Sequence, residues 1–572
     1  MSKLSRTIVT ILIALFWAAM WYIFLPALNL RSVGFWCFML FTFVCAAVIL
    51  FIAIYEMDAK KQDKIFGITW KVCAILLGLF LIADLISIRP FNAGTAQQVA
   101  KVEVSESDIS EAFPDLSVEG TDNLPLVDLD TAKVLGDKKL AVLKHASWYD
   151  VDDEYNLIQY QGKYYRLSVI DYGGFFKYMK ARSEGTPGYV LVDVTPHNGV
   201  VTQEAKLVQV EDALRYTPGA YFQHDLHRHL RFQYPTLILG KDSYLEIDEE
   251  GNPYWVTCVF KPTAGVFGVK TVQSFVLTNA QTGESQLYSI GEAPEWVDHV
   301  LPLDYLMDTA YWHYAYGDGF FNNMFSKTNV WRTSYYYKDA NSKQNDEDSA
   351  AGKFANFFGY NSMIDKDGQI LFYTGLTAAN NADSNVGWLT IDCSTGEMTQ
   401  YSVIGAEESS AQAAVEQLVQ DLRYEATFPL PANIGGQPSY IMCLKGKAGL
   451  AQGYAICNVE NYSIAVQADT LDKAISLYLG KLGMAPEPTV TDQTDDTEQT
   501  RDIQSKTAKI EGIEKAEIDG TTQFYYLIDG DLYRASIKIN QNQVLFRAGD
   551  QIKVSYYADG EIFTIVQIER VE

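Results

Sequence analysis

The sequence predicts an α+β fold in which three N-terminal transmembrane helices precede repeated units of antiparallel β-meander plus helix, followed by a small C-terminal β-barrel. Three observations support this prediction: long apolar runs near the N-terminus, a pattern of strands and turns that returns along the chain, and a final segment of short strands joined by Asp-Gly turns. With 572 residues, nearly half of them apolar, the chain is long enough to form several domains with sizeable cores.

The first element is a membrane anchor. Apolar runs cover residues 8–28, 33–55 and 68–88, and each is about long enough to cross the ~30 Å hydrocarbon core of a bilayer. Lysines and arginines precede the first run and crowd the loop between the second and third, which predicts a cytoplasmic N-terminus. We therefore expect residues 1–92 to anchor a multi-pass protein in a bacterial cell membrane, with a large extracytoplasmic region after Arg89.

Two polar features lie near this anchor. Asp84 is within the third apolar run, only a few residues before Arg89, so we expect a hydrated or paired acid at the membrane boundary. Residues 93–131 are acidic and contain few large apolar side chains, and we interpret them as a solvated spacer.

A repeated pattern organises the next part of the chain. An acidic Gly turn precedes an apolar strand, and a Thr-Gly-Glu turn then joins two more strands, at 248–300 and again at 365–419. A third copy covers 437–482 and ends in a helical pattern at 471–479, and we expect a helix at 293–300 in the first copy. Fixed-order self-similarity predicts supersecondary units that share one core.

The C-terminal part contains a linker and a barrel. Residues 484–506 are rich in Thr, Asp, Glu and Pro and cannot bury enough apolar area to order themselves, which indicates a flexible acidic linker. About five short strands at 507–572 predict a small antiparallel barrel, OB-like or SH3-like. Between the spacer and the linker, the predicted parts are a first α+β unit (132–242), a second unit with an aromatic-rich insert (243–362), and third and fourth units (363–483).

Composition and motifs exclude several functions. The formal net charge of −26 and the lack of a basic stripe argue against a nucleic-acid partner. The sequence contains no Gly-x-Ser-x-Gly elbow, no His-Glu-x-x-His motif and no phosphate-binding Gly-rich loop. We therefore predict no catalytic residues and no cofactor, and we expect the partners to be the lipid bilayer and another envelope or membrane protein.

One pair of cysteines suggests a disulfide. Cys443 and Cys457 flank a loop between two expected antiparallel strands, and a symmetric hairpin would place them opposite each other. The alternative is two buried thiols, because Cys258, the repeat counterpart of Cys443, has no second cysteine to pair with.

A basic cluster is predicted to be a polar interaction patch rather than a metal site. Either a helix or a strand would align at most two of its imidazoles, and its arginines would repel a cation. The cluster consists of His224, His227, Arg228, His229 and Arg231.

An aromatic stretch is the best candidate for a recognition surface. Exposed Tyr and Trp offer large amphipathic area, whereas buried rings would be core packing, which we expect for most aromatic residues of the chain. The stretch consists of Tyr311, Trp312, Tyr314, Tyr316, Phe320 and Phe321.

The repeated unit resembles the PepSY family of small extracytoplasmic modules over the three copies described above. Motifs at 172–178, 185–189, 228–236 and 426–436 resemble a set of uncharacterised membrane-anchored proteins of Gram-positive bacteria, and this likeness covers most of the chain. PepSY modules are associated with modulating peptidases and with protein contacts at the envelope, so the resemblance implies binding rather than turnover.

The leading functional hypothesis is a non-catalytic, membrane-anchored extracytoplasmic scaffold or interaction protein of the bacterial cell envelope. One alternative is an envelope enzyme acting on peptidoglycan or peptides, which requires acids or a His cluster that converge in one cleft. Another is a sensor or transport-associated subunit, which an Asp84 facing a partner helix would support.

Overall fold

The computed structural model divides the chain into two compact units, Met1–Pro486 and Glu487–Glu572. It describes residues 3–484 except 56, 106–108, 110–112, 114, 117–120, 198, 336–358 and 380, and residues 504–570 except 519–520, 537–538, 540–542, 544 and 560–561. Most of the predicted linker, and much of the aromatic-rich insert, therefore lie outside the described residues.

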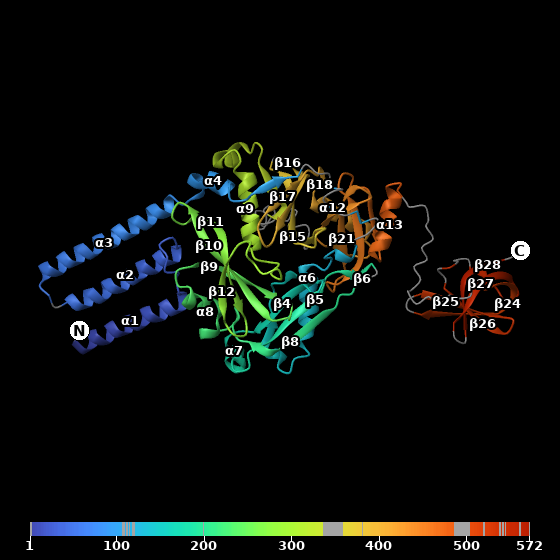
Figure 1. The fold of residues 1–572 in the computed structure, drawn as a ribbon, viewed down its shortest axis with the longest axis horizontal. Coiled ribbons are helices and arrows are strands. Elements are labelled where there is room, and N and C mark those ends of the chain that lie inside the picture. The colour runs from blue at the N-terminus through green and yellow to red at the C-terminus, as the bar shows by residue number, and fades with distance from the viewer. Residues whose placement is uncertain are drawn as a thin grey trace. The chain divides into compact units, whose positions relative to one another are not determined.

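Three apolar helices begin the first unit: α1 (Lys3–Phe24), α2 (Val33–Ile54) and α3 (Ala59–Leu85) (Figure 1). Each is long and apolar enough to cross a membrane. Their large apolar side chains are mostly exposed, as expected for surfaces that face lipid. The prediction of three N-terminal apolar helices is confirmed.

The predicted spacer is wrong for the residues that the structure describes. After α4 (Arg89–Gln97), strand β1 (Val102–Val104) pairs in parallel with β17 (Met398–Tyr401). Phe113 is buried edge-on against Trp388, with ring centroids 5.6 Å apart. The stretch is polar on average, but its few apolar residues enter the main core, and average composition does not reveal this.

The next part of the chain forms a sheet with strand order β2-β4-β5-β8, with β3 beside β4. Its central strand β4 is buried at nearly every position, because its alternating side chains enter two separate cores, one on each face of the strand. The elements are α6 (Leu129–Leu140), β2 (Tyr149–Val151), β3 (Asn156–Tyr160), β4 (Lys163–Tyr172), α7 (Phe175–Ala181), β5 (Thr186–Asp193), the ribbon of β6 (Pro196–His197) and β7 (Val200–Val201), β8 (Ala205–Leu214), the 3₁₀ turn η3 (Phe222–His224) and α8 (Leu226–Gln233).

An antiparallel meander follows, with strand order β12-β11-β10-β9. Its strands are β9 (Ile238–Ile247), β10 (Pro253–Ala264), β11 (Gly268–Asn279) and β12 (Ser285–Ser289). The helix expected at 293–300 is wrong, because helix α9 spans Leu303–Ala315 instead. The His299 N–H donates to Glu246 Oε1 of β9 at 3.1 Å and the Val300 N–H donates to the Cys393 carbonyl at 3.1 Å, so the end of this segment bonds to distant parts of the chain.

Two more sheets, each accompanied by a helix, complete the first unit. One contains β13 (Trp331–Thr333), β14 (Asn361–Ile364), β15 (Ile370–Ala378), β16 (Asn381–Asp392), β17 and β18 (Gly405–Ala406), followed by α12 (Glu408–Leu418). The other contains β19 (Glu425–Ala426), β20 (Leu430–Ile434), β21 (Gln437–Lys445), β22 (Ala451–Asn458) and β23 (Ala465–Ala468), followed by α13 (Leu471–Lys481).

The Thr-Gly-Glu turns of the two copies share the same hydrogen bonds from backbone N–H groups to side-chain oxygens. Asn279 Oδ1 accepts from the Gln281 and Thr282 N–H groups, and Asp392 Oδ1 accepts from the Ser394 and Thr395 N–H groups. In both turns, the threonine hydroxyl also accepts from the N–H of the glutamate two residues later. The same local chemistry therefore joins β11 to β12 and β16 to β17.

The predicted disulfide is wrong. Strands β21 and β22 do pair, but Cys443 lies opposite Tyr454 and Cys457 lies opposite Tyr440. Tyr440, the residue opposite Cys457, lies three positions before Cys443, so the two thiols are three positions out of step. Both cysteines are free and buried, and the Cys443 thiol donates to the Leu126 carbonyl at 3.2 Å.

The second unit is a closed five-stranded barrel, which confirms the prediction of a C-terminal β-barrel. Its strands are β24 (Gln504–Ile518), β25 (Thr521–Ile528), β26 (Asp531–Ser536), β27 (Gln551–Asp559) and β28 (Ile562–Arg570), in the order β24-β25-β26-β28-β27. Strands β26 and β28 pair in parallel. The barrel has a core of its own, in which Tyr526, Ile552 and Ile565 are fully buried.

Candidate functional site

The strongest candidate site is a cleft that begins at the end of α3. Three adjoining hollows of about 680, 140 and 200 Å³ form it, and Asp242 lines all three. The largest hollow starts at Ser87 and Arg89, directly after the third membrane helix. We call the three hollows together the juxtamembrane cleft, and the two smaller ones its inner part.

A bulge in β9 supplies one wall of the cleft. Along β9 and β10, Ser243 pairs with Thr257 and Leu239 pairs with Val259, so three residues of β9 face one residue of β10. Those three residues are 240–242. Side chains of a regular strand point alternately to its two faces, and a bulge of this kind changes the direction in which some of them point. The bulge thereby brings both Lys241 and Asp242 into the cleft.

Helix α9 supplies the opposite wall. Asp304, Asp308 and Trp312 all line the outer hollow, and their spacing of four residues places them on one face of the helix. The Arg89 guanidinium lies over the Trp312 ring, 3.9 Å from its centroid, which fixes α4 against α9. The outer hollow is nearly balanced in charge, because Arg89, Lys241 and Lys270 face its three aspartates.

The turn between β2 and β3 supplies further acids. The Glu154 N–H donates to Asp152 Oδ1 at 2.9 Å, which shapes the turn so that the Glu154 side chain lines both inner hollows. Asp153 lines one of them and lies 3.6 Å from Lys133 Nζ.

The inner part of the cleft is therefore negative. Its lining has five carboxylates and two permanent cations, a formal excess of three negative charges. Burial, together with the charges of Asp152, Asp242 and Asp304, raises the pKa of Glu154 to about 7. The acids are Asp152, Asp153, Glu154, Asp242 and Asp304, and the cations are Arg166 and Lys241.

His299 and Tyr244 line one of the inner hollows. The His299 ring stacks on Tyr244 with centroids 4.2 Å apart, and its Nε2 lies 2.8 Å from the Leu301 carbonyl. A carbonyl only accepts, so Nε2 carries the proton. Burial lowers the pKa of His299 to about 4, which keeps the ring neutral and leaves Nδ1 as an acceptor.

This arrangement suits an organic cation. Among the described residues, no three His, Cys, Asp or Glu side chains are grouped as metal ligands. The nearby Ser243 hydroxyl is engaged with the Thr257 hydroxyl at 2.7 Å, and the Cys258 thiol donates to the Val300 carbonyl at 2.9 Å. Carboxylates and a neutral imidazole together form an acceptor-rich cavity for an ammonium or guanidinium group.

The predicted basic patch is divided among several roles. His227 lines an inner hollow of the cleft, and Arg231 donates to the carbonyls of Tyr234 and Leu237 near the end of α8. His224 and His229 both contact the Tyr216 ring, and His229 also bonds to the Gly283 carbonyl at 2.7 Å. Arg228 faces Tyr22 of α1.

The predicted aromatic recognition surface is mostly core. Trp312, Tyr314 and Tyr316 are buried, and Tyr314 donates to Gln400 Oε1 at 2.8 Å. Tyr311 and Phe320 pack against a small core that includes Trp312, and Phe321 is exposed. Helix α4 and strand β13 both pack against α9, so the surface prediction is wrong for Trp312, Tyr314 and Tyr316.

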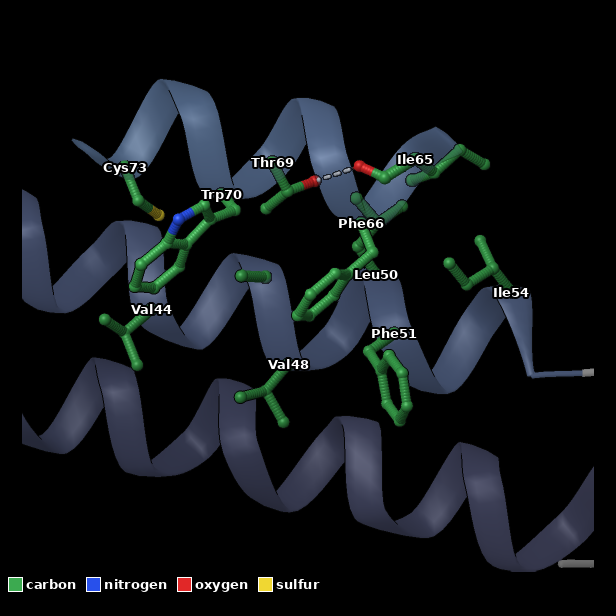
Figure 2. Close-up of a pocket in the computed structure, with 11 residues that line it drawn as sticks. Val44, Val48, Leu50, Phe51, Ile54, Ile65, Phe66, Thr69, Trp70 and Cys73 are labelled. Atoms are coloured by element: carbon green, nitrogen blue, oxygen red, sulfur yellow. Dashed lines mark hydrogen bonds between the residues drawn. The ribbon is translucent and has the colours of Figure 1, made fainter. Parts of the chain in front are cut away.

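A separate hollow, of about 400 Å³, lies between the apolar helices α2 and α3. Figure 2 shows apolar side chains from both helices facing this space, among them Val48, Phe51, Phe66 and Trp70. The Thr69 hydroxyl donates back to the Ile65 carbonyl at 3.0 Å, so its proton is already engaged. Lipid chains would fill such a surface without selectivity.

No family model and no curated protein matches this chain. Sequence analysis did not identify the cleft, because its acids come from three separate segments. The one local signal is the sequence Gly240-Lys241-Asp242, where a Gly and two charged residues interrupt an apolar strand.

Proposed function

We propose that this protein is a membrane-anchored interaction protein of the bacterial cell envelope whose juxtamembrane cleft binds a cationic group of its partner. The observation that carries the proposal is the negative inner part of the cleft, where Glu154, Asp242 and Asp304 come from three different elements. A lysine or arginine side chain of a partner would neutralise these acids and form charge-assisted hydrogen bonds with them.

The proposal places the cleft outside the cell. Lys3 and Arg6 precede α1, and Lys60, Lys61 and Lys64 lie near the start of α3, which favours a cytoplasmic side at these positions. Protease added to intact cells should then digest the region after Arg89, whereas the loop between α2 and α3 should be cut only after lysis. The reverse pattern would contradict the orientation.

The repeats also fit an interaction protein. The equivalent turn bonds of the two copies support PepSY-like repeats, and PepSY modules are associated with modulating peptidases and with protein contacts at the envelope. In the second unit, the parallel pairing of β26 with β28 requires a crossover that a simple meander lacks, and this favours the OB-like interpretation of the barrel.

The test uses the full-length protein in nanodiscs and a defined small cation. We expect the tripeptide Gly-Lys-Gly to bind and Gly-Glu-Gly not to bind, as measured by isothermal titration calorimetry. Each of Glu154→Gln and Asp242→Asn should weaken binding roughly tenfold or more, because a hydrogen bond to a charged group contributes about 1.5–3 kcal/mol. Binding should strengthen as pH rises through about 7, where Glu154 becomes charged.

Matched controls remove the same charge elsewhere. Asp367→Asn and Glu460→Gln neutralise exposed acids outside the cleft and should leave the affinity unchanged. Equal losses in the cleft and control variants would show attraction by overall charge, and would count against a specific site.

One observation favours a second function, an envelope hydrolase. A carboxyl with a pKa of about 7 is suited to general acid or base catalysis at neutral pH. Under this alternative Glu154 is the general acid or base, and the purified protein should cleave peptidoglycan peptides with a rate that Glu154→Gln abolishes. Binding without turnover would support the first proposal.

A further inference from the structure

A surface beside the end of α1 combines exposed aromatic rings with cations. Helix α8 is held there by three contacts with the chain around α1. The Arg228 guanidinium lies 4.5 Å from the centroid of the Tyr22 ring, and Phe232 meets Trp21 edge-on at 6.1 Å. The Leu28 N–H donates to the Pro235 carbonyl at 2.7 Å. Tyr22 and Trp21 occupy the last turns of α1, where a membrane helix passes through the headgroup layer.

The surface continues from α8 to α7 through direct contacts. Arg228 Nη1 donates to the Phe222 carbonyl at 2.7 Å, and the Phe222 ring lies 6.2 Å from Phe175. Phe175 in turn contacts Phe176, which is 81% exposed. Figure 1 shows α8 beside the end of α1. We call the exposed surface of α7, η3 and α8 the α7–α8 face.

The charge of this face opposes that of the chain. Lys180 and Arg182 are exposed on and just after α7, whereas Lys177 lies 3.5 Å from Asp150. Glu184 and Asp150 are the nearby acids, and Asp225 is occupied as the N-cap of α8. A cationic face is complementary to anionic lipid, whereas contact with the same face of another copy would bring like charges together.

We propose that the α7–α8 face docks on the bilayer that contains α1 and binds anionic phospholipid headgroups. Phe176 and Phe232 enter the interfacial layer with their apolar rings, while the exposed Lys180 and Arg182 face the phosphates. Arg231 takes no part, since its guanidinium bonds to the carbonyls near the end of α8. This inference is independent of the cleft and of which side of the membrane the face occupies.

Hydrogen–deuterium exchange of the full-length protein tests the proposal. We would compare nanodiscs of phosphatidylcholine alone with nanodiscs that also contain phosphatidylglycerol. Amides at 173–182 and 219–233 should exchange several-fold more slowly with phosphatidylglycerol. The triple variant Phe176→Ser, Lys180→Glu, Arg182→Glu should lose this difference, because each basic residue near an anionic surface changes binding about fivefold.

Controls separate docking from other effects. Leu477→Ser combined with Lys473→Glu removes an exposed apolar side chain and a cation from α13, and should retain the lipid-dependent protection. Inorganic phosphate added to phosphatidylcholine nanodiscs should not reproduce it. Equal exchange in both lipids, or protection that survives in the triple variant, would overturn the proposal.

Discussion

Glu154 combines a role in the proposed binding site with a cost in stability. Its ordinary pKa is 4.5 and its folded pKa is about 7, because burial and the neighbouring acids disfavour the charge. Between pH 4.5 and about 7, the folded protein therefore holds a proton on Glu154 that the unfolded chain has lost. The contribution of this group to the free energy of unfolding falls as pH rises through this range. The same carboxylate would attract a ligand cation above pH 7, where it destabilises the empty protein.

We predict that Glu154→Gln removes this pH dependence. A glutamine has no proton to lose, so the variant and the native protein should have equal Tm values below pH 4.5, and the variant should have the higher Tm above pH 7. Thermal unfolding followed by tryptophan fluorescence at a fixed scan rate would measure the difference. Glu460→Gln serves as the exposed control. A difference that is constant with pH would show that Glu154 does not titrate in this window.

Single residues were the hardest to interpret from sequence. The cysteine prediction depended on a symmetric hairpin, whereas the observed register places Cys457 opposite Tyr440, and nothing local to Cys443 or Cys457 indicates that register. The aromatic prediction failed for Trp312 because burial depends on neighbours far along the chain, here Arg89 of α4. The sequence did not predict the acids of the cleft for the same reason, because only the tertiary structure brings Glu154 and Asp304 together.

Elements were predicted better, because turns and apolar periods are local. The acidic Gly turns and the Thr-Gly-Glu turns lie where the sequence placed them, and the helix predicted at 471–479 lies within α13 (Leu471–Lys481). The helix expected at 293–300 failed because the His299 N–H bonds to Glu246 of β9 and the Val300 N–H bonds to the Cys393 carbonyl. A local pattern cannot show that a partner elsewhere offers a better acceptor.

One junction between elements attaches the chain after α3 to the turn between β10 and β11. The Ser87 hydroxyl accepts from the N–H groups of Val266 and Phe267, both at 2.9 Å, in the turn between β10 and β11. Gly268 faces the same residue, and a Cβ there would lie 2.3 Å from the Ser87 carbonyl oxygen. The turn and the helix end are therefore packed backbone to backbone.

We predict that Gly268→Ala separates this junction. Both sides of the contact are backbone, so relief requires a shift of the turn or of the α3 end, and overpacking of this kind costs about 1–3 kcal/mol. The loosened junction should be seen as a lower Tm and as faster proteolysis of the chain between α3 and α4. Gly94→Ala in α4 is the control, because its Cβ would meet nothing within 4 Å and alanine favours a helix. An unchanged cleavage rate in Gly268→Ala would contradict the tight junction.

At the scale of the whole chain, the two units have separate cores. The core of the barrel draws only on residues of the second unit, and the main core draws only on residues of the first. Sequence analysis found this division, because the Thr- and Asp-rich stretch before the barrel contains too few apolar residues to join either core. Separate cores predict separate unfolding.

Calorimetry of the full-length protein should therefore show two transitions. Ile552→Ala in the barrel and Ile456→Ala in the first unit are matched, because both isoleucines are fully buried. Each loses about 2–5 kcal/mol, and for a domain as small as the barrel that lowers the Tm by roughly 10 °C or more. Ile552→Ala should move only the barrel transition and Ile456→Ala only the other. If either substitution moves both transitions together, the units unfold as one and the barrel is not an independent module.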